Sequence, residues 1–223
     1  MSAYYAEKLA GERLRRCYEL APPRVRQYLE AEIRHVARRL GGRKSVLELG
    51  CGYGRVALAL ARAGFHVTGV DTAEESLELA QRLNDTQPPC EFLLRDARDL
   101  GFPGGSFDAV VCVQNGIAAF GVDPLALLRE ALRVTRTGGL LLFSSYSDRF
   151  WPERLAWFEA QSEAGLLGPL DRAATGEGWI VCQDGFRSGR VTPGEFRALA
   201  DTLGLEIRVS EVDESSVFCE TVR

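Results

Sequence analysis

The residues at positions 48–54, Glu-Leu-Gly-Cys-Gly-Tyr-Gly, have the types and the spacing that most directly suggest chemistry in this chain. Because glycine has no Cβ, a segment with three alternating glycines can turn sharply and let the backbone approach a ligand closely. Two carboxylates that could accept hydrogen bonds follow at a distance, Asp71 and Asp96. A glycine loop alone is weak evidence, because many such loops are tight turns. Its meaning depends on the elements that position it and the two acids.

The segment from residue 45 to residue 147 alternates apolar runs with amphipathic stretches. The runs SVLELG, HVTGVD, EFLLRD, FDAVVCVQN and LLLFSSYS predict five strands. VALALARAG, AEESLELAQRLN and PLALLREALRVTRTGG predict helices between strands, the last one closed by its glycines. Strands and helices in this order form a parallel, doubly wound sheet with right-handed crossovers. The glycine loop then follows the first strand, and Asp71 ends the second, where a carboxylate can accept hydrogen bonds from both hydroxyls of a ribose.

The rest of the chain predicts appended helices and further strands. Residues 4–40 have helical periodicity, and Pro22 and Pro23 divide them into two helices. Residues 148–190 interrupt the alternation of strands and helices, and they predict a Trp/Phe-rich helix and a hairpin that turns near residues 183–185. A capped helix and two strands complete the sequence.

These elements predict one α/β domain over residues 1–223, with a doubly wound, Rossmann-like, seven-stranded sheet that is mostly parallel and has an antiparallel last strand. Its expected parts are an N-terminal helical cap (1–44), a cofactor-binding core (45–147), a lid insertion after the fifth strand (148–190), and a C-terminal helix with a strand pair (191–223). A length of 223 residues with 46% hydrophobic residues suits a single packed core.

Composition and charge narrow the range of partners. The formal net charge of -4 gives no general attraction for nucleic acid, whose binding depends on Lys and Arg at phosphates. The six cysteines are scattered, without a C-x-x-C pair or a Cys/His cluster at zinc-ligand spacing, so no metal is expected. The first twenty residues lack the apolar run of a signal peptide, and no stretch of 18 apolar residues occurs. We therefore expect a cytoplasmic protein without a membrane segment.

The ordered motifs between residues 45 and 147 resemble those of the class I S-adenosylmethionine-dependent methyltransferases. The family's E/D-x-G-x-G-x-G loop is matched by residues 48–54, its ribose-binding acid by Asp71, and its adenine-facing acid by Asp96, which Ala97 follows. The ordered set is far more specific than any single member. The resemblance implies S-adenosylmethionine as cofactor, S-adenosylhomocysteine as product, and in-line methyl transfer to an O, N or S atom of a small molecule.

The resemblance also implies roles for individual residues. Glu48 would lie near the ammonium group of the cofactor, the glycines would pass under its methionine part, and Val113 and Gln114 would line the methionyl side. An acidic pocket suits a ligand that carries a sulfonium and an ammonium. The implied cofactor-binding residues are Glu48, Gly50, Cys51, Gly52, Gly54, Asp71, Thr72, Asp96, Ala97, Val113 and Gln114.

The acceptor should lie beyond the carboxyl ends of the strands, under whatever covers that edge. The N-terminal helices and the insertion qualify, so the candidate acceptor contacts are Tyr4, Tyr5, Asn115, Tyr146 and Trp151. Capping or core hydrogen bonds are the alternative for Asn115 and Tyr146, and the core of the lid is the alternative for Trp151. An oxygen acceptor with a high pKa would need a base, for which the candidates are Tyr5, His35, Tyr146 and Asp148.

Two other functions stay open beside this one. A nicotinamide-dependent Rossmann oxidoreductase requires a glycine at the last position of G-x-G-x-x-G, where Arg55 stands, and it gives no role to Asp96. A methyltransferase-like cofactor-binding or partner subunit without its own catalysis would keep the same loop and acids. Turnover of a small molecule separates that subunit from an enzyme.

Overall fold

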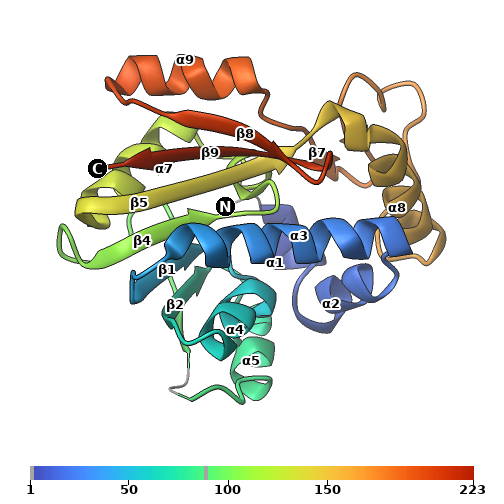
Figure 1. The fold of residues 1–223 in the computed structure, drawn as a ribbon. Helices are drawn as coiled ribbons and strands as arrows, with labels where there is room; N and C mark the ends of the chain where they lie inside the picture. The colour runs from blue at the N-terminus through green and yellow to red at the C-terminus, as the bar shows by residue number, and fades with distance from the viewer. Residues whose placement is uncertain (1–2, 88–89) are drawn as a thin grey trace.

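The computed structural model describes residues 3–87 and 90–223, in which helices cover both faces of a seven-stranded sheet (Figure 1). The strands of this sheet are β1 (Ser45–Leu49), β2 (His66–Asp71), β3 (Glu91–Leu94), β4 (Phe107–Cys112), β5 (Thr135–Tyr146), β8 (Arg208–Val212) and β9 (Ser216–Val222). The helices are α1 (Ala3–Lys8), α2 (Gly11–Glu19), α3 (Pro23–Leu40), α4 (Arg55–Arg62), α5 (Glu74–Arg82), α6 (Gly116–Ala119), α7 (Pro124–Val134), α8 (Trp151–Glu163) and α9 (Pro193–Leu203). A 3-10 turn, η1 (Asp148–Phe150), and a small hairpin of β6 (Ile180–Val181) and β7 (Arg187–Ser188) complete them.

The strand order is β3-β2-β1-β4-β5-β9-β8, and the first five strands of that order are parallel. β9 is antiparallel to both β5 and β8, which confirms the predicted antiparallel last strand. The order reverses between β1 and β4, so the connections that leave these strands run to opposite faces of the sheet. A doubly wound sheet opens a crevice at such a point, outside the carboxyl ends of the strands.

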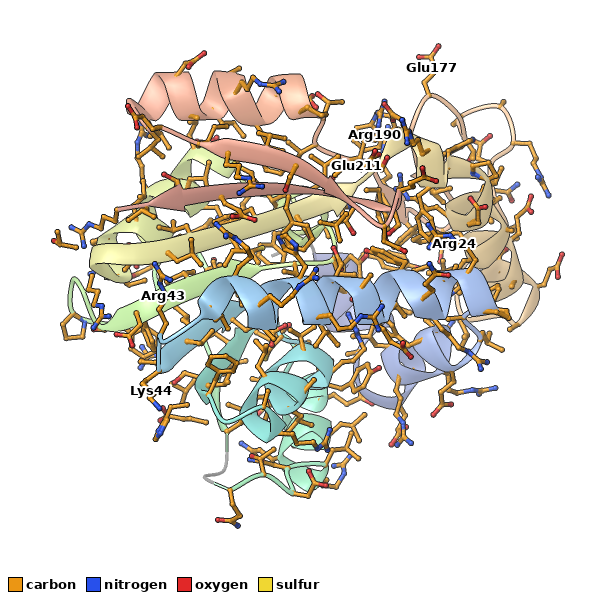
Figure 2. All side chains as sticks on the ribbon, in the orientation of Figure 1. Arg24, Arg43, Lys44, Glu177, Arg190 and Glu211 are labelled. Atoms are coloured by element: carbon orange, nitrogen blue, oxygen red, sulfur yellow. The ribbon has the colours of Figure 1, made fainter. Side chains whose placement is uncertain are left out.

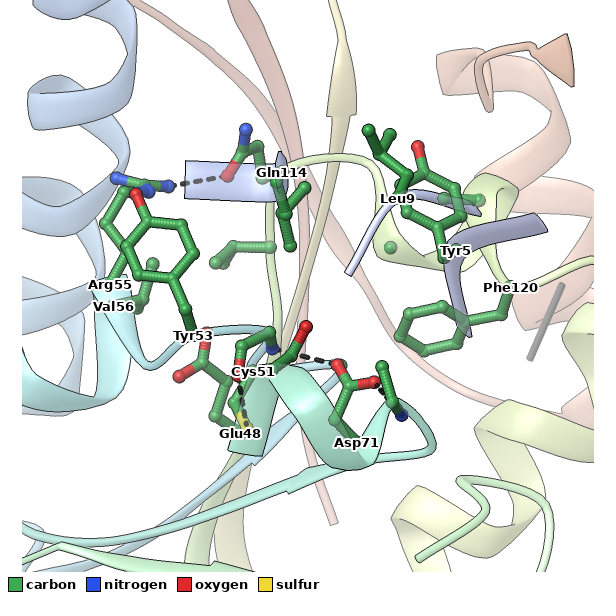
Figure 3. Close-up of a pocket in the computed structure, with 18 of the residues that line it drawn as sticks. Tyr5, Leu9, Glu48, Cys51, Tyr53, Arg55, Val56, Asp71, Gln114 and Phe120 are labelled. Carbon is green, nitrogen blue, oxygen red and sulfur yellow. Dashed lines mark hydrogen bonds between the residues drawn. The ribbon is translucent and has the colours of Figure 1, made fainter. Parts of the chain in front are cut away.

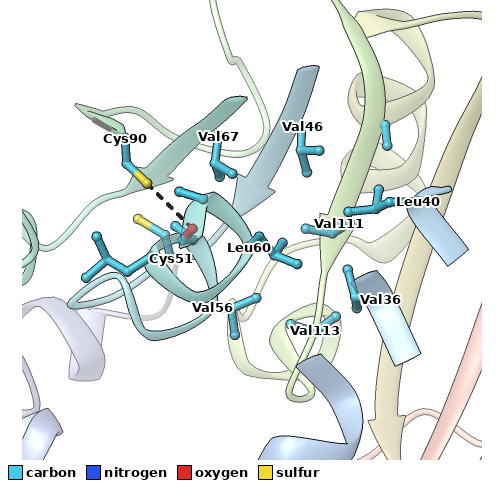
Figure 4. Packing of buried hydrophobic residues seen from close by; sticks show 14 of the residues in the cluster. Val36, Leu40, Val46, Cys51, Val56, Leu60, Val67, Cys90, Val111 and Val113 are labelled. Carbon is cyan, nitrogen blue, oxygen red and sulfur yellow. Dashed lines mark hydrogen bonds between the residues drawn. The ribbon is translucent and has the colours of Figure 1, made fainter. Parts of the chain in front are cut away.

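Two buried apolar clusters fill the faces of the sheet. One packs α3, α4 and α5 against the strands, and Figure 4 shows Val36 and Leu40 of α3 beside Val111 of β4. The other packs α6, α7 and α9 against the opposite face. Each fully buried Val or Leu side chain stabilises the fold by about 1.5–3 kcal/mol relative to exposure. The glycine loop therefore rests on a sheet that is buried on both faces.

The N-terminal helices and residues 148–190 pack on each other and form what we call the cover. A third apolar cluster joins them, and within it Trp157 donates from Nε1 to the backbone oxygen of Cys17 at 2.8 Å. Tyr4 donates to Asp184 Oδ2 at 2.5 Å, across 180 positions of the sequence. Arg154, which is 1% exposed, donates to backbone oxygens of Gly178, Ser188 and Gly189 and so holds the hairpin on α8.

Two boundaries differ from the sequence-based expectation. The N-terminal region forms three helices, because a break at Gly11, with φ of 53°, separates α1 from α2. The backbone N–H of Gly11 donates to Ser76 Oγ at 2.9 Å, so a contact distant in sequence fixes this break. α7 ends at Val134, and Gly138 and Gly139 lie within β5 and do not close the helix.

Within residues 3–87 and 90–223, no helix is long and apolar enough to cross a lipid bilayer.

Candidate functional site

A pocket opens at the carboxyl ends of β1, β2 and β4, where the glycine loop faces α1, α2 and α6 (Figure 3). It holds about 770 Å³ of empty space when the open solvent at its mouth is included. Its charged lining residues are Glu48, Arg55 and Asp71, and its aromatic ones are Tyr5, Tyr18, Tyr53 and Phe120. The predicted crevice is thus a pocket with acids on one side and aromatic rings around its rim.

The glycine loop has the conformation that its sequence predicts. Gly50 and Gly52 have φ of 69° and 53°, in the left-handed region where a side chain is strained. A Cβ on Gly50 would stand 2.4 Å from the ring of Phe120, so a side chain there would also collide with the pocket wall. The backbone N–H groups of Gly50 and Cys51 both donate to the carbonyl oxygen of Val70, which ties the loop to the end of β2.

Asp71 connects the glycine loop to the segment that follows β2. Its Oδ2 accepts from the backbone N–H of Gly52 at 2.8 Å, and its Oδ1 accepts from that of Ala73 at 2.9 Å. The carboxylate is 8% exposed, and burial raises its pKa although the two N–H groups oppose the shift. Each oxygen has a second lone pair, so Asp71 can hold the loop and still accept a hydrogen bond from a ligand.

Glu48, the fourth residue of β1, is 3% exposed, and its Oε2 has no hydrogen-bond partner among the described residues. Burial raises the pKa of its carboxyl to about 8, while the positive charge of Arg55 opposes the shift. Without a ligand beside it, the Glu48 carboxyl is therefore mostly protonated at neutral pH. A buried carboxyl oxygen without a partner is costly, and a cationic ligand group beside it would favour the ionised form of Glu48.

The opposite wall of the pocket follows β4. Gln114 and Asn115 have φ of 54° and 64°, which is uncommon for residues other than glycine and marks many functional sites. The amide Oε1 of Gln114 accepts from Arg55 Nη2 at 2.6 Å, and its backbone N–H donates to Ser144 Oγ at 2.8 Å. Ser144 donates in turn to Oε1 of the fully buried Glu32 at 2.6 Å. This chain of hydrogen bonds holds the end of β4 in its strained form.

Most of the predicted cofactor residues lie together in this pocket. Those that line it are Glu48, Gly50, Cys51, Gly52, Asp71, Val113 and Gln114, whereas Gly54, Thr72, Asp96 and Ala97 do not. Asp96 follows β3 and forms an ion pair with Arg98 at 2.7 Å, and this hydrogen-bonded contact lowers the pKa of its carboxyl to about 2. Ala97 is buried at 1% exposure.

The predicted acceptor residues are spread over the cover. Tyr5 lines the pocket, while Tyr4 is bound to Asp184. Asn115 donates from Nδ2 to the backbone oxygen of Gly189 at 3.0 Å and accepts from Ser145, so it connects β4 to the insertion. The guanidinium of Arg154 lies 4.1 Å from the ring centroid of Tyr146 and 5.7 Å from that of Trp151. Neither of these aromatic residues lines the pocket of the glycine loop.

The four candidate bases also fall in different places. His35 Nε2 lies 2.8 Å from Glu220 Oε1, outside the pocket lining, and burial lowers the pKa of the imidazole. Asp148 pairs with Arg190 at a second hollow that Glu211 also lines; Figure 2 places Arg190 and Glu211 at one end of the molecule. Burial raises the pKa values of Tyr5 and Tyr146, so both hydroxyls are protonated at neutral pH.

The sequence interpretation did not include several residues that shape the pocket. Phe120 directly follows α6, a single turn with no clear period in the sequence, and Tyr18 faces the pocket only because α2 docks there. The sequence pattern could have identified Glu32, because this residue occupies a buried position of α3 between Leu29 and Val36. A carboxylate on an apolar helix face marks a polar contact in the interior.

Metal ligands do not gather within the described part of the chain. Residues 3–87 and 90–223 contain no group of three or more His, Cys, Asp or Glu side chains that could hold a metal ion. All six cysteines are free and buried. Burial raises the pKa of the Cys51 thiol, which lines the pocket beside Gly52, so this thiol stays protonated.

The sequence of the chain is similar to those of known methyltransferases. Residues 46–139 match a family model described as a methyltransferase domain. The chain is 31% identical over 137 residues to the 2-methyl-6-phytyl-1,4-hydroquinone methyltransferase of Synechocystis, which covers 57% of this chain and 42% of that protein. It is 30% identical over 126 residues to a ubiquinone biosynthesis O-methyltransferase of Hydrogenovibrio crunogenus, which covers 56% of this chain and 52% of that protein.

A solved structure extends the likeness of fold to almost the whole chain. The magnesium protoporphyrin IX methyltransferase from Synechocystis, with bound SAM, has a TM-score of 0.62 and 19% identity, and the comparison covers 99% of this chain and 93% of that one. The sequence likeness is shorter, because the chain spans about half the length of the curated relatives that it matches.

Proposed function

We propose that this chain is a class I S-adenosylmethionine-dependent methyltransferase that transfers the methyl group of S-adenosylmethionine to a small organic acceptor, as its match to a methyltransferase domain and its methyltransferase relatives support. The observation that carries the proposal is the pocket at the carboxyl ends of β1, β2 and β4, where the glycine loop lies beside two buried acids. The bound cofactor would supply a methyl group activated by a sulfonium. The chain itself must bind the cofactor, orient the acceptor and exclude water.

The residues in the pocket fit the cofactor group by group. Asp71 has lone pairs left for ribose hydroxyls, and Glu48 offers a carboxyl whose Oε2 has no partner to a cationic ammonium. Gly50 and Gly52 leave room for the methionyl chain, because neither carries a side chain into the pocket. Adenine recognition by Asp96 and Ala97 stays a prediction, and it requires Asp96 to share its carboxylate with Arg98.

We assign the acceptor to the part of the pocket under the cover. Tyr5 lies in α1 and Leu9 directly follows this helix, whereas Leu14 and Tyr18 lie in α2. All four residues line the pocket. In-line displacement needs alignment and a dry site, which a packed cover supplies. Because Tyr5 keeps its proton at neutral pH, it acts here as a hydrogen-bond donor, and the acceptor is one that attacks without a strong base, such as a thiol, an amine or an ionised phenol.

The experiment is a direct assay of methyl transfer. Purified protein is incubated with S-adenosylmethionine and pools of phenols, hydroquinones, thiols, amines and carboxylates, and the release of S-adenosylhomocysteine is measured. Hydroquinones belong in the panel because one relative is named for that substrate. Turnover that requires both an acceptor and Asp71 supports the proposal. Binding of S-adenosylhomocysteine without turnover of any pool favours a binding subunit, and binding of neither cofactor nor product contradicts the proposal.

A further inference from the structure

Arg55 lies on the pocket wall, where it donates hydrogen bonds to neutral groups. Its Nη2 donates to Gln114 Oε1 at 2.6 Å, its Nη1 donates to the backbone oxygen of Leu29 at 3.4 Å, and its guanidinium is 5.2 Å from the ring centroid of Tyr18. Among the residues that the structure describes, no carboxylate oxygen forms an ion pair with it. Arg62, at the other end of the same helix, pairs with Asp85 at 2.7 Å. Of the two arginines of α4, Arg62 therefore has an ion pair with a carboxylate, and Arg55 has none among the described residues.

The position of Arg55 in its helix is also unfavourable. It is the first residue of α4, where unpaired backbone N–H groups and the helix dipole concentrate positive charge. A cation at a helix N-terminus is disfavoured, whereas Arg62 in the last turn is where the dipole favours one. The half-buried guanidinium of Arg55 acts on the Glu48 and Glu32 carboxyls through space, since its charge opposes the rise of their pKa values, and it keeps N–H donors for an anion in direct contact.

The pocket itself shows where that anion would come from. Glu48 and Asp71 line the same space, and within the described chain Arg55 is the one cationic side chain that does so. Figure 3 shows Arg55 and Gln114 in the upper part of the view, with Glu48 and Asp71 below them. Asp71 would repel a ligand carboxylate, and Glu48 would do so once a ligand ammonium favours its ionised form. A ligand with both an ammonium and a carboxylate therefore requires a cation in the pocket.

We infer that Arg55 is the residue that binds a ligand carboxylate in this pocket. A guanidinium has five N–H donors, so Arg55 can hold a carboxylate and keep its hydrogen bond to Gln114. The carboxylate belongs either to the methionyl part of the cofactor or to an acidic acceptor, and the chemistry is the same for both. The inference rests on the proposed function, because it takes the ligand of this pocket to be the cofactor or its acceptor.

The first arm of the test uses two ligands that differ by one carboxylate. Calorimetric titration compares S-adenosylhomocysteine with its decarboxylated analogue S-adenosyl-3-thiopropylamine. If the cofactor is the source, the wild type should bind S-adenosylhomocysteine about 10- to 100-fold more tightly, the usual range for a charged hydrogen-bonded contact. Arg55→Gln should remove that preference and leave the affinity for the amine analogue nearly unchanged.

The second arm asks whether the carboxylate belongs to the acceptor. Protein saturated with S-adenosylhomocysteine is titrated with benzoate and with benzamide, which differ in charge at the same position. A preference for benzoate that Arg55→Gln removes identifies the acceptor as the source. Either arm alone supports the inference. It is overturned if Arg55→Gln leaves every carboxylate preference intact, weakens both members of each pair equally, or if the wild type has no preference in either arm.

Two further variants keep the result interpretable. Arg62→Gln removes an arginine from the same helix outside the pocket, so it should preserve the carboxylate preference. If Arg55→Gln does not fold, Arg55→Met repeats both arms with the aliphatic stem retained. Failure of the proposed function is a separate outcome, because then the wild type would not bind S-adenosylhomocysteine at all.

Discussion

The glycine-loop side of the pocket and its cover are built in different ways. On the loop side, Asp71 accepts from Gly52 and Ala73, partners that lie 19 and 2 positions away in the sequence. In the cover, Tyr4 contacts Asp184 and Trp157 contacts Cys17, across 180 and 140 positions. The loop side is therefore specified by one motif and one neighbouring strand, whereas the cover exists only when distant parts of the chain have packed together.

The two sides also differ in charge and in the groups that they offer a ligand. The loop side presents Glu48 and Asp71, two buried acids, and backbone atoms of the glycines. The cover presents mostly apolar and aromatic surface, including Tyr5 and Tyr18. The first suits a ligand that carries a positive charge, and the second suits an apolar or aromatic ligand. We thus expect loop-side substitutions to act on cofactor affinity and cover substitutions to act on turnover.

The largest effect is expected at Gly52. Gly52→Val places a β-branched side chain at φ of 53° in the pocket, so binding of S-adenosylhomocysteine should be lost in a calorimetric titration. Gly41→Val is the matched control, since Gly41 has φ of 55° and a Cβ there meets no atom within 4 Å. It should lower the melting temperature by a similar amount and leave binding intact. Normal binding to a folded Gly52→Val variant would place the ligand elsewhere.

The next effect tests the cover. Removal of residues 1–8 takes away α1 with Tyr4 and Tyr5, and turnover should fall about 100-fold because the acceptor loses alignment and shielding from water. Affinity for S-adenosylhomocysteine should fall less than tenfold, because the loop side remains. Tyr4→Phe, which removes only the hydrogen bond to Asp184, should have a much smaller effect. An undiminished rate in the truncated protein would show that α1 has no part in acceptor binding.

A third prediction compares two aspartates that each accept from two backbone N–H groups. Asp71→Asn should weaken binding of S-adenosylhomocysteine by about 1–3 kcal/mol, because a charged acceptor for ribose hydroxyls is lost. Asp108 accepts from the N–H groups of Lys44 and Ser45 at the amino end of the sheet, and Figure 2 places Lys44 far from Arg190 and the insertion. Asp108→Asn should therefore lower stability without changing affinity. Equal losses of affinity in the two variants would remove Asp71 from the site.

The same contrast explains what the sequence could predict. Local periodicity indicates the strands of the sheet and the glycine motif indicates the loop that contacts Asp71, because short segments determine these features. The start of β5 at Thr135 is an exception, because it lies in a stretch whose pattern predicts a helix. The break at Gly11 and the pocket-facing position of Phe120 depend on tertiary packing that a single sequence does not contain. The adenine-facing role of Asp96 is implied by the family resemblance alone. Its ion pair with Arg98 shows that a motif residue can also have a partner close in sequence.

The smallest effect is a dependence on pH that sharpens the role of Glu48. Its pKa is raised to about 8 by burial, so it is largely protonated at pH 6 and increasingly ionised as the pH approaches 8. If its ionised form binds the ligand ammonium, affinity for S-adenosylhomocysteine should rise severalfold between pH 6 and pH 8, at most about tenfold per pH unit, and binding at pH 7 should release a proton.

Calorimetry in two buffers with different ionisation enthalpies measures that proton directly. Glu48→Gln, which keeps the shape of the side chain and cannot ionise, should bind more weakly at pH 8 and lose both the pH dependence and the proton release. The raised pKa also means that ionisation of Glu48 destabilises the empty protein, so the free energy of unfolding of the wild type should fall relative to Glu48→Gln as the pH rises from about 4.5 to 8. An affinity that is flat from pH 6 to pH 8 in the wild type would assign the ammonium to another group and leave Glu48 as a structural residue of β1.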